Sequence, residues 1–169
     1  MEITITINGK PVQATVDDAV IREAMGEKKT GYERNEGNSY YIVLEHGDVQ
    51  VSNDELSLDD VRYKVANYYS DFAVAQNNAR ADKLMRQLRR FAAEHGGCVP
   101  PKKTIKSSVG HSIYWDGKKP DVCSGCVPDF GRMWFASNNA AYSAIVAFHD
   151  ELMWYFTEYD PMPKGWWDK

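Results

Sequence analysis

The chain has 169 residues, of which 43% are hydrophobic, 12% aromatic and 26% charged, and its formal net charge is −4. This length fits one domain, or one domain with a small appendage, that can bury a substantial core. The sequence contains neither an apolar run long enough to span a bilayer nor a secretory leader, so we expect a cytoplasmic protein without a membrane partner.

The first predicted element is an N-terminal β-hairpin. Residues 2–7 alternate strictly between polar and apolar side chains, and residues 12–16 repeat that alternation. Asn8-Gly9 lies between the two runs, and both residue types tolerate the positive φ of a tight hairpin turn.

A short helix and a linker are predicted next. Asp17 or Asp18 is a suitable N-cap for a short helix that Gly26 ends, so residues 1–26 form the first unit. Residues 27–39 are polar and punctuated by glycine, which predicts a linker. The main domain is expected to cover residues 40–169.

The main domain contains the pattern of a β-β-β-α unit twice. The first copy has predicted strands at residues 40–45, 49–52 and 61–69 and a helix that begins at Ser70-Asp71. The second copy has predicted strands at residues 112–116, 121–122 and 132–135 and a helix that begins near Ser137. In both copies an aromatic pair, Tyr68-Tyr69 or Trp134-Phe135, precedes the polar helix cap, which indicates an internal duplication.

Two long helices are the clearest secondary-structure predictions. In the first, Gly96-Gly97 ends a helix whose apolar stripe consists of Phe72, Ala75, Ala79, Leu84, Leu88, Phe91 and Ala92. In the second, apolar residues recur at spacings of three and four from Ala141 to Phe156, and Pro161 is the latest position at which it ends. The predicted fold class is therefore α+β, with the two helices packed on a small, mostly antiparallel sheet or sheets.

Four side chains in two short pairs are candidate zinc ligands. His95 and Cys98 form an H-x-x-C pair, and Cys123 and Cys126 form a C-x-x-C pair. A two-residue spacer lets both donors of a pair reach one ion, and two such pairs complete a tetrahedral structural site. His111 is the alternative fourth ligand.

Other roles for the cysteines remain open at this point. A disulfide framework would leave one of the three cysteines unpaired, and disulfides are rare in a reducing cytosol. A redox C-x-x-C normally opens a helix after a strand, whereas Pro120 and Pro128 bracket this one in a predicted loop. Unbound, unreactive cysteines are the third alternative.

A row of basic residues on the first long helix is the second candidate site. It consists of Arg80, Lys83, Arg86 and Arg90, on one broad side of the helix. The row could neutralise phosphates or contact an acidic protein surface, and the alternative is an ordinary solvated face. Because the chain as a whole is acidic, we expect a protein partner before nucleic acid. The acidic segment at residues 45–60 is predicted to be a surface loop.

The C-terminal tail places Trp166 and Trp167 close to two prolines. Tryptophans in such a position either anchor a binding partner or fold back over the last helix. Elsewhere, the sequence has no glycine-rich phosphate loop, no G-x-S-x-G elbow and no H-E-x-x-H zinc motif. We therefore expect a protein that is not an enzyme.

Four segments resemble small accessory proteins encoded by phages and prophages of Gram-positive bacteria. They are residues 28–34, 67–71, 88–95 and 154–159, with the sequences KKTGYER, NYYSD, LRRFAAEH and WYFTEY. Of the proposed zinc ligands only His95 lies in one of these segments. A zinc ion would thus be an addition in this member, one that holds residues 96–131 together.

Some phage proteins of this size are anti-CRISPR proteins, which block an RNA-guided Cas nuclease, so the resemblance implies an inhibitor of a host defence factor. It would act in the host cytoplasm by binding a host protein and blocking nucleic-acid loading or a conformational step. The alternative is a nucleic-acid-binding accessory protein that uses the basic row. A zinc- or thiol-dependent enzyme is the third reading.

Overall fold

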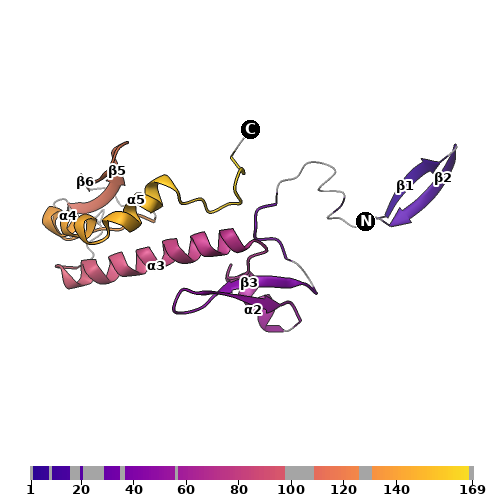
Figure 1. The fold of residues 1–169 in the computed structure, drawn as a ribbon, viewed down its shortest axis with the longest axis horizontal. Coiled ribbons are helices and arrows are strands. Elements are labelled where there is room, and N and C mark those ends of the chain that lie inside the picture. The colour runs from indigo at the N-terminus through magenta and orange to yellow at the C-terminus, as the bar shows by residue number, and fades with distance from the viewer. Residues whose placement is uncertain are drawn as a thin grey trace.

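The computed structural model describes residues 2–7, 9–15, 20, 29–34, 37–55, 57–97, 109–125 and 131–167. Strands β1 (Glu2–Ile7) and β2 (Lys10–Thr15) pair antiparallel, with Ile5 opposite Val12, which confirms the predicted N-terminal hairpin. Figure 1 draws this hairpin apart from the other elements. Of the short helix predicted to end at Gly26, only Val20 lies within the described residues.

Within the described residues, two further antiparallel hairpins and four helices form the body of the molecule. β3 (Ser39–Val43) pairs with β4 (Val49–Asn53), and α2 (Ser57–Lys64) and α3 (Phe72–Glu94) follow. β5 (Gly110–Trp115) pairs with β6 (Pro120–Gly125), and α4 (Asn138–Ala147) and α5 (His149–Thr157) follow. These elements make the predicted α+β fold.

Both hairpins of the body have a third, very short strand partner, as the predicted duplication requires. Tyr69 pairs with Tyr41 of β3, and the two residues exchange backbone hydrogen bonds of 2.8 and 2.9 Å. Phe135 pairs in the same way with His111 of β5, through bonds of 2.7 and 3.2 Å. Tyr69 and Phe135 are both buried, and each stands two residues before the N-cap of the next helix. The two copies therefore both run from a hairpin through a short third strand to a capped helix, and in the first copy α2 lies between the hairpin and the third strand.

The strand predicted at residues 61–69 is wrong for most of its length. Helix α2 covers its first part, and only its end lies beside β3. The Asn67 side-chain amide accepts a hydrogen bond of 2.8 Å from the Val43 N–H and donates one of 2.9 Å to the Val43 carbonyl, as the backbone of a paired strand would. Val61 and Val65 favoured a strand because β-branched residues suit sheets, but here both are exposed, Val61 on the helix and Val65 just after it.

Ala66 follows α2 in the left-handed conformation, with a φ of 57°. Its N–H donates to the Tyr63 carbonyl at 3.1 Å and the Asn67 N–H donates to the Arg62 carbonyl at 2.9 Å, a Schellman pattern in which glycine is usual. We expect Ala66→Gly to raise the free energy of unfolding, measured with urea, by about 0.5–1 kcal/mol, because glycine adopts this conformation without strain. As a control, Gln76→Gly inside α3 should lower it by about 1 kcal/mol. A less stable Ala66→Gly protein would contradict the prediction.

Helix α3 follows the sequence prediction at both ends. Asp71 caps its first turn, and its carboxylate accepts a hydrogen bond of 3.0 Å from the Val74 N–H. At the other end, the Gly97 N–H donates to the Ala92 carbonyl at 2.8 Å, and Gly96 and Gly97 both have a positive φ. The two glycines thus end the helix because they adopt a conformation that other residues rarely take.

The second predicted long helix is broken in two. α4 begins after Ser137, whose hydroxyl accepts a hydrogen bond of 3.1 Å from the Ala140 N–H, as expected for its cap. The helix ends at Phe148, where φ is −121° and ψ is 28°, and α5 begins at the next residue. The Phe148 ring lies edge-on to Phe91 of α3, with ring centroids 5.6 Å apart. Sharp breaks in helices usually occur at proline or glycine. Neither residue stands at Phe148, so the apolar spacing predicted one continuous helix.

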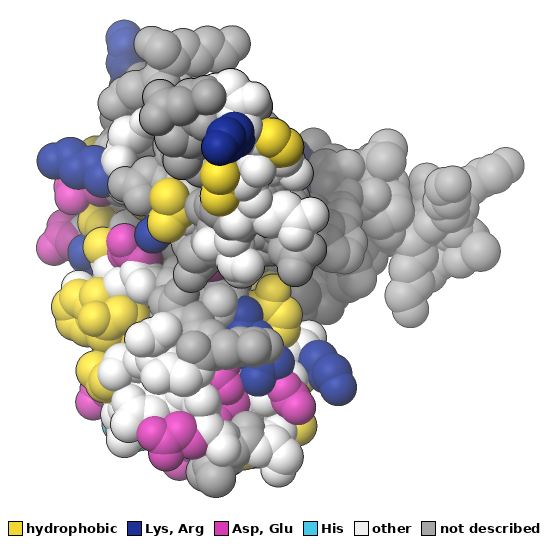
Figure 2. All heavy atoms as spheres, turned by 90° about the vertical axis from the view of Figure 1, so that its right-hand side faces the viewer, with side chains coloured by type: hydrophobic (Ala, Val, Ile, Leu, Met, Phe, Trp, Pro, Cys, Tyr) yellow, Lys and Arg dark blue, Asp and Glu magenta, His cyan; other side chains and the backbone are white. Residues whose placement is uncertain are grey.

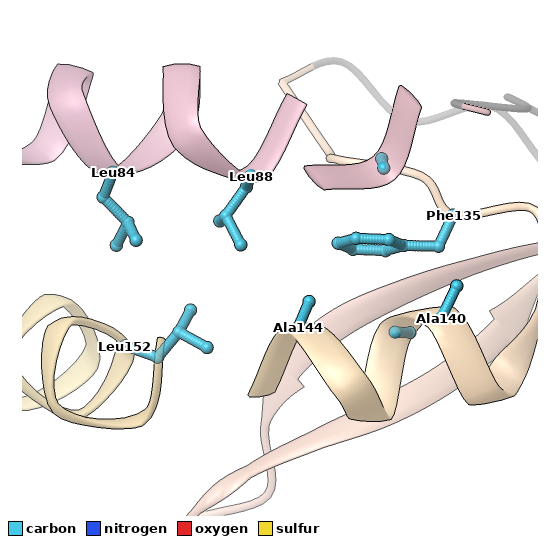
Figure 3. Packing of buried hydrophobic residues seen from close by; sticks show 8 residues of the cluster. Leu84, Leu88, Phe135, Ala140, Ala144 and Leu152 are labelled. Atoms are coloured by element: carbon cyan, nitrogen blue, oxygen red, sulfur yellow. The ribbon is translucent and has the colours of Figure 1, made fainter. Parts of the chain in front are cut away.

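The main core lies between α3 on one side and α4 and α5 on the other. Figure 3 shows Leu84 and Leu88 of α3 pointing toward α4 and α5, with Leu152 of α5 pointing back at them. The small side chains of Ala140 and Ala144 leave room for the fully buried ring of Phe135. A smaller cluster at the other end of α3 joins that end of the helix to β3 and β4.

Residues 29–34, part of the segment predicted as a linker, pack against the start of α3. A Cβ atom on Gly31 would lie 2.8 Å from a side-chain carbon of that helix, so glycine is required there. The Glu33 carboxylate accepts hydrogen bonds from the Thr30 hydroxyl at 2.8 Å, the Gly31 N–H at 3.0 Å and the Ser70 hydroxyl at 2.8 Å. Burial alone would raise the pKa of Glu33, but hydrogen bonds from Thr30 and Ser70 lower it to about 2. The charged carboxylate therefore fastens this segment to the body.

Candidate interaction surface

The predicted basic row lies on the solvent side of α3, and its four members, Arg80, Lys83, Arg86 and Arg90, are all exposed. Their surroundings differ. Arg90 lies 4.0 Å from Glu94 one turn later, a distance at which an exposed pair contributes little. Lys83 and Arg86 form no ion pair within the described part of the chain.

Arg80 is engaged within the molecule. Its guanidinium donates hydrogen bonds of 2.8 and 3.2 Å to the Glu151 carboxylate and lies 4.0 Å from the ring centroid of Trp154. Both partners belong to α5, so Arg80 joins α5 to α3 through an ion pair and a cation–π contact. The members of the predicted row that remain for a partner are Lys83, Arg86 and Arg90, named here the α3 cations.

Two open grooves flank Lys83. One lies between α3 and the corner of α4 and α5 at residues 146–151. The other lies between α3 and the turn that joins β3 to β4, and it includes Asp48, Val49 and Phe72. Arg80 and Lys83 line both grooves, so these side chains form the wall between them. A partner that lies across α3 at this point would contact both repeated units.

The charges around the α3 cations are of both signs. The walls of the two grooves carry the carboxylates of Asp48, Asp150 and Glu151. Figure 2, which views the molecule from the right-hand side of Figure 1, shows Lys and Arg side chains among Asp and Glu side chains on that face as well. Mixed charge of this kind suits recognition of another protein better than attachment to a uniformly charged phosphate backbone.

The acidic segment at residues 45–60, predicted as a surface loop, contains a buried charge. The Asp59 side chain is 1% exposed and accepts hydrogen bonds from the Tyr40 hydroxyl, from Arg62 at 3.1 Å and from the Glu55 N–H at 3.0 Å. These donors satisfy the carboxylate oxygens inside the protein, where water does not reach them. The segment is therefore partly a structural element that attaches α2 to β3, a role that no local sequence pattern indicates.

Asp54 extends this buried network. Its carboxylate accepts two hydrogen bonds from Arg34, at 2.9 and 3.0 Å, and one of 3.1 Å from the Tyr68 hydroxyl. The Arg34 hydrogen bonds lower the pKa of Asp54 below its ordinary value, although burial opposes them. The ring of Tyr68 stacks on Tyr40 with centroids 3.9 Å apart, so the two carboxylates sit at the edges of one aromatic pair. Each of the two carboxylates has an arginine partner, Arg34 for Asp54 and Arg62 for Asp59.

Of the four proposed zinc ligands, His95 and Cys123 lie within the described residues, and Cys98 and Cys126 lie outside them. His95 is the C-cap of α3, and its ring stacks on Phe91 with centroids 3.8 Å apart. The Nδ1 atom lies 2.8 Å from the Phe91 carbonyl oxygen. An imidazole that donates from Nδ1 to a carbonyl leaves Nε2 for a metal ion, an arrangement that is usual around zinc.

Cys123 faces Ser112 across the β5–β6 hairpin. Its sulfur atom lies 3.1 Å from the Ser112 hydroxyl and 3.6 Å from an Arg132 nitrogen. His111, the alternative ligand, places Nδ1 2.9 Å from the Ser124 hydroxyl. Among the residues with described positions, no three or more His, Cys, Asp or Glu side chains are grouped as metal ligands. The zinc site stays a prediction of the sequence.

Elemental analysis of the purified protein tests that prediction. We expect about one zinc ion per chain, because four ligands from two pairs saturate one tetrahedral ion. Cys123→Ser should remove the metal and lower the melting temperature, since Cys123 belongs to both ligand sets. His95→Ala and His111→Ala distinguish the two sets. Protein that contains no zinc, and whose melting temperature a chelator does not change, would show the prediction to be wrong.

The two tryptophans of the tail have different environments. Trp167 is 67% exposed, and its indole N–H donates to Asp160 at 3.1 Å. Trp166 is half-buried. The residues before them fold back onto α3, where the Tyr159 hydroxyl donates to Asn78 at 2.9 Å. Trp167 is thus the tryptophan of this pair whose ring is available to a partner.

Comparison of the chain with protein-family models, curated proteins and solved structures found no match. The interpretation of its function accordingly depends on the geometry of the chain itself. Across the described ranges, no helix combines the length and apolar character that crossing a bilayer requires.

Proposed function

We propose that the chain is a phage-encoded inhibitor that binds a host defence protein, with an RNA-guided Cas nuclease as the specific target. The observation that carries this proposal is the position of the α3 cations, which are all exposed, with Lys83 on a ridge between two open grooves. A small substrate is usually held in an enclosed pocket, whereas a ridge between grooves suits a protein surface.

The charge distribution supports a protein partner. A chain of net charge −4 that carries three neighbouring cations on one helix can be attracted to an acidic patch and held in one orientation. Trp167 supplies an exposed aromatic side chain of the type that contributes strongly to protein interfaces. The inhibitor would act by occupying the surface, without turnover, and would keep the nuclease from loading nucleic acid or from changing conformation.

The test uses purified Cas nucleases from Gram-positive hosts and a target-DNA cleavage assay. The wild-type chain should form a stoichiometric complex with one of them and inhibit it. A variant with Lys83→Glu, Arg86→Glu and Arg90→Glu should bind at least about tenfold more weakly. The matched control changes three exposed lysines elsewhere, Lys118→Glu, Lys119→Glu and Lys164→Glu, and should bind like the wild type.

Two results would overturn the proposal. One is that the chain neither binds nor inhibits any nuclease in the panel. The other is that it binds DNA or RNA alone, with an affinity that falls steeply with salt and is lost in the variant that reverses the α3 cations. The second result would establish the nucleic-acid-binding alternative.

A further inference from the structure

The outer side of strand β4 is an open sheet edge. Tyr41 of β3 exchanges its backbone hydrogen bonds with Tyr69, so Val51, its neighbour on β4, directs its N–H and C=O away from β3. Bond directions alternate along a strand, and Val49 therefore has the same orientation. Within the described residues, no hydrogen bond is made by these outward backbone groups. The edge thus offers donors and acceptors in the arrangement that a further strand needs.

The corresponding edge of the second unit, on β6, is protected for most of its length. By the same alternation, Pro120 and Val122 direct their backbone groups outward. Proline has no N–H, and the Val122 N–H donates to the Asp121 carboxylate at 2.8 Å. Lys119 and Asp121 also place charges beside this edge. Proline and charged side chains are the usual protection of a sheet edge against pairing with another chain.

Strand β4 has no such protection. Residues 49–53, with the sequence VQVSN, include neither a charge nor a proline. Gln50 is exposed, and Val51 is 55% exposed although it lies beside Tyr41 on the face of the sheet that α3 covers. An added strand would pair the free backbone groups and cover Val51 at the same time. An uncharged open edge of this kind is a pairing site.

We infer that β4 pairs antiparallel with β4 of a second copy of this chain, across a two-fold axis at Gln50. Val-Gln-Val at residues 49–51 reads the same in both directions, so Val49 of each copy lies opposite Val51 of the other. Both residues face outward, and each such pair exchanges both of its N–H···O bonds. Gln50 then lies opposite Gln50 of the second copy, where the two amides hydrogen-bond. This inference does not depend on the proposed function.

The charges next to β4 favour a second copy as the occupant. In this register Asp48 lies opposite Ser52 of the second copy. The Asp48 side chain is 79% exposed, and the Ser52 hydroxyl accepts a hydrogen bond of 3.0 Å from Arg62. The pairing therefore brings an Asp48 carboxylate toward an Arg62 guanidinium on both sides of the two-fold axis. From residue 48 to residue 52 no like charges lie opposite each other. One sequence thus supplies both halves of a complementary edge.

The dimer would also enlarge a small sheet. β3 and β4 form a two-stranded sheet with a bridge to Tyr69, and a hairpin of this size has little stability of its own. Pairing makes one continuous sheet, in which Val49 and Val51 of both copies form an apolar row on the side of α3. Because one pair of edge strands buries less area than a standard interface, we expect a dissociation constant of about 10–100 µM.

Sedimentation velocity of the purified chain tests the inference. The wild type should change from monomer to dimer as its concentration passes through that range. Gln50→Lys and Gln50→Glu each place like charges at the two-fold axis, and each should raise the dissociation constant at least about tenfold. An equimolar mixture of the two variants should form the dimer again, because lysine then lies opposite glutamate.

Gln13→Lys is the matched control, since Gln13 is an exposed glutamine on β2 of the N-terminal hairpin. This variant should dimerise like the wild type. Val51→Pro removes an outward N–H that has no partner in the described part of the chain, and proline is tolerated on an edge strand. It should abolish the dimer and leave the circular dichroism spectrum of the monomer unchanged.

Several results would overturn the inference. A wild type that stays monomeric at about 1 mM does not pair at this edge, and loss of binding to another protein in Val51→Pro would then identify a foreign strand as the occupant. A dimer that both Gln50 variants retain, or that Gln13→Lys loses, has its interface elsewhere. Variants whose mixture stays monomeric would contradict the two-fold register. None of these results decides the proposed function, which depends on nuclease binding and inhibition.

Discussion

Asp59→Asn is expected to lower the free energy of unfolding by about 3 kcal/mol. The substitution keeps the shape of the side chain but removes the charge that holds the Arg62 guanidinium and the Tyr40 hydroxyl. The cost lies at the lower end of the range for buried ion pairs, because the Arg62 side chain keeps 26% of its surface exposed and can regain water. Urea denaturation followed by circular dichroism measures the change.

Asp60→Asn is the matched control for this prediction. Asp60 is the next residue on α2 and also has an arginine partner, Arg34 at 2.6 Å, but its side chain is 50% exposed. An exposed ion pair contributes about 1 kcal/mol or less, so the control should lose little stability. Equal losses in the two variants would contradict the role assigned to burial of Asp59.

Phe135→Ala is expected to lower the free energy of unfolding by about 3–5 kcal/mol, a large part of the total for a domain of this size. Phe135 is 0% exposed and lies between α3 and α4, where the alanines of α4 cannot expand to fill the space it leaves. Its backbone pairing with His111 should survive, since that contact uses only N–H and C=O groups.

Phe72→Ala provides the comparison, because Phe72 starts α3 but is 45% exposed. Its ring contacts Tyr41 at a centroid distance of 5.2 Å, so about 1 kcal/mol is expected from its removal. The same denaturation experiment serves for both phenylalanines. A loss for Phe135→Ala that is no greater than the loss for Phe72→Ala would show that the core does not depend on this ring.

The repeated unit and the ends of α3 could be predicted because their signals are local. An aromatic pair followed by Asp71 or Ser137 indicates a short buried strand and a helix cap within a few residues. The conformation of residues 57–65 could not be predicted in this way. Prediction from periodicity assumes that the apolar side of a helix is buried. Helix α2 instead exposes its apolar residues and buries Asp59. The break at Phe148 could not be predicted either, because neither proline nor glycine stands at that point of the sequence.

The candidate surface was predictable only in part. Helical spacing places Arg80, Lys83 and Arg90 toward solvent, and the structure agrees. The engagement of Arg80 with Glu151 and Trp154 is a contact between residues 71 or more positions apart, which no local pattern indicates. The sequence therefore predicts which residues are exposed more reliably than which of them remain available to a partner.

Helix α3 belongs to the first repeated unit but packs with the hairpins of both, because it supplies Val74 and Ala75 to one hydrophobic cluster and Leu84 and Leu88 to the other. Neither hairpin has enough strands to be stable without that helix. Loss of either cluster would leave half of α3 unsupported and so weaken the other. Despite its small, separate sheets, the body should melt in one cooperative transition, with equal calorimetric and van't Hoff enthalpies.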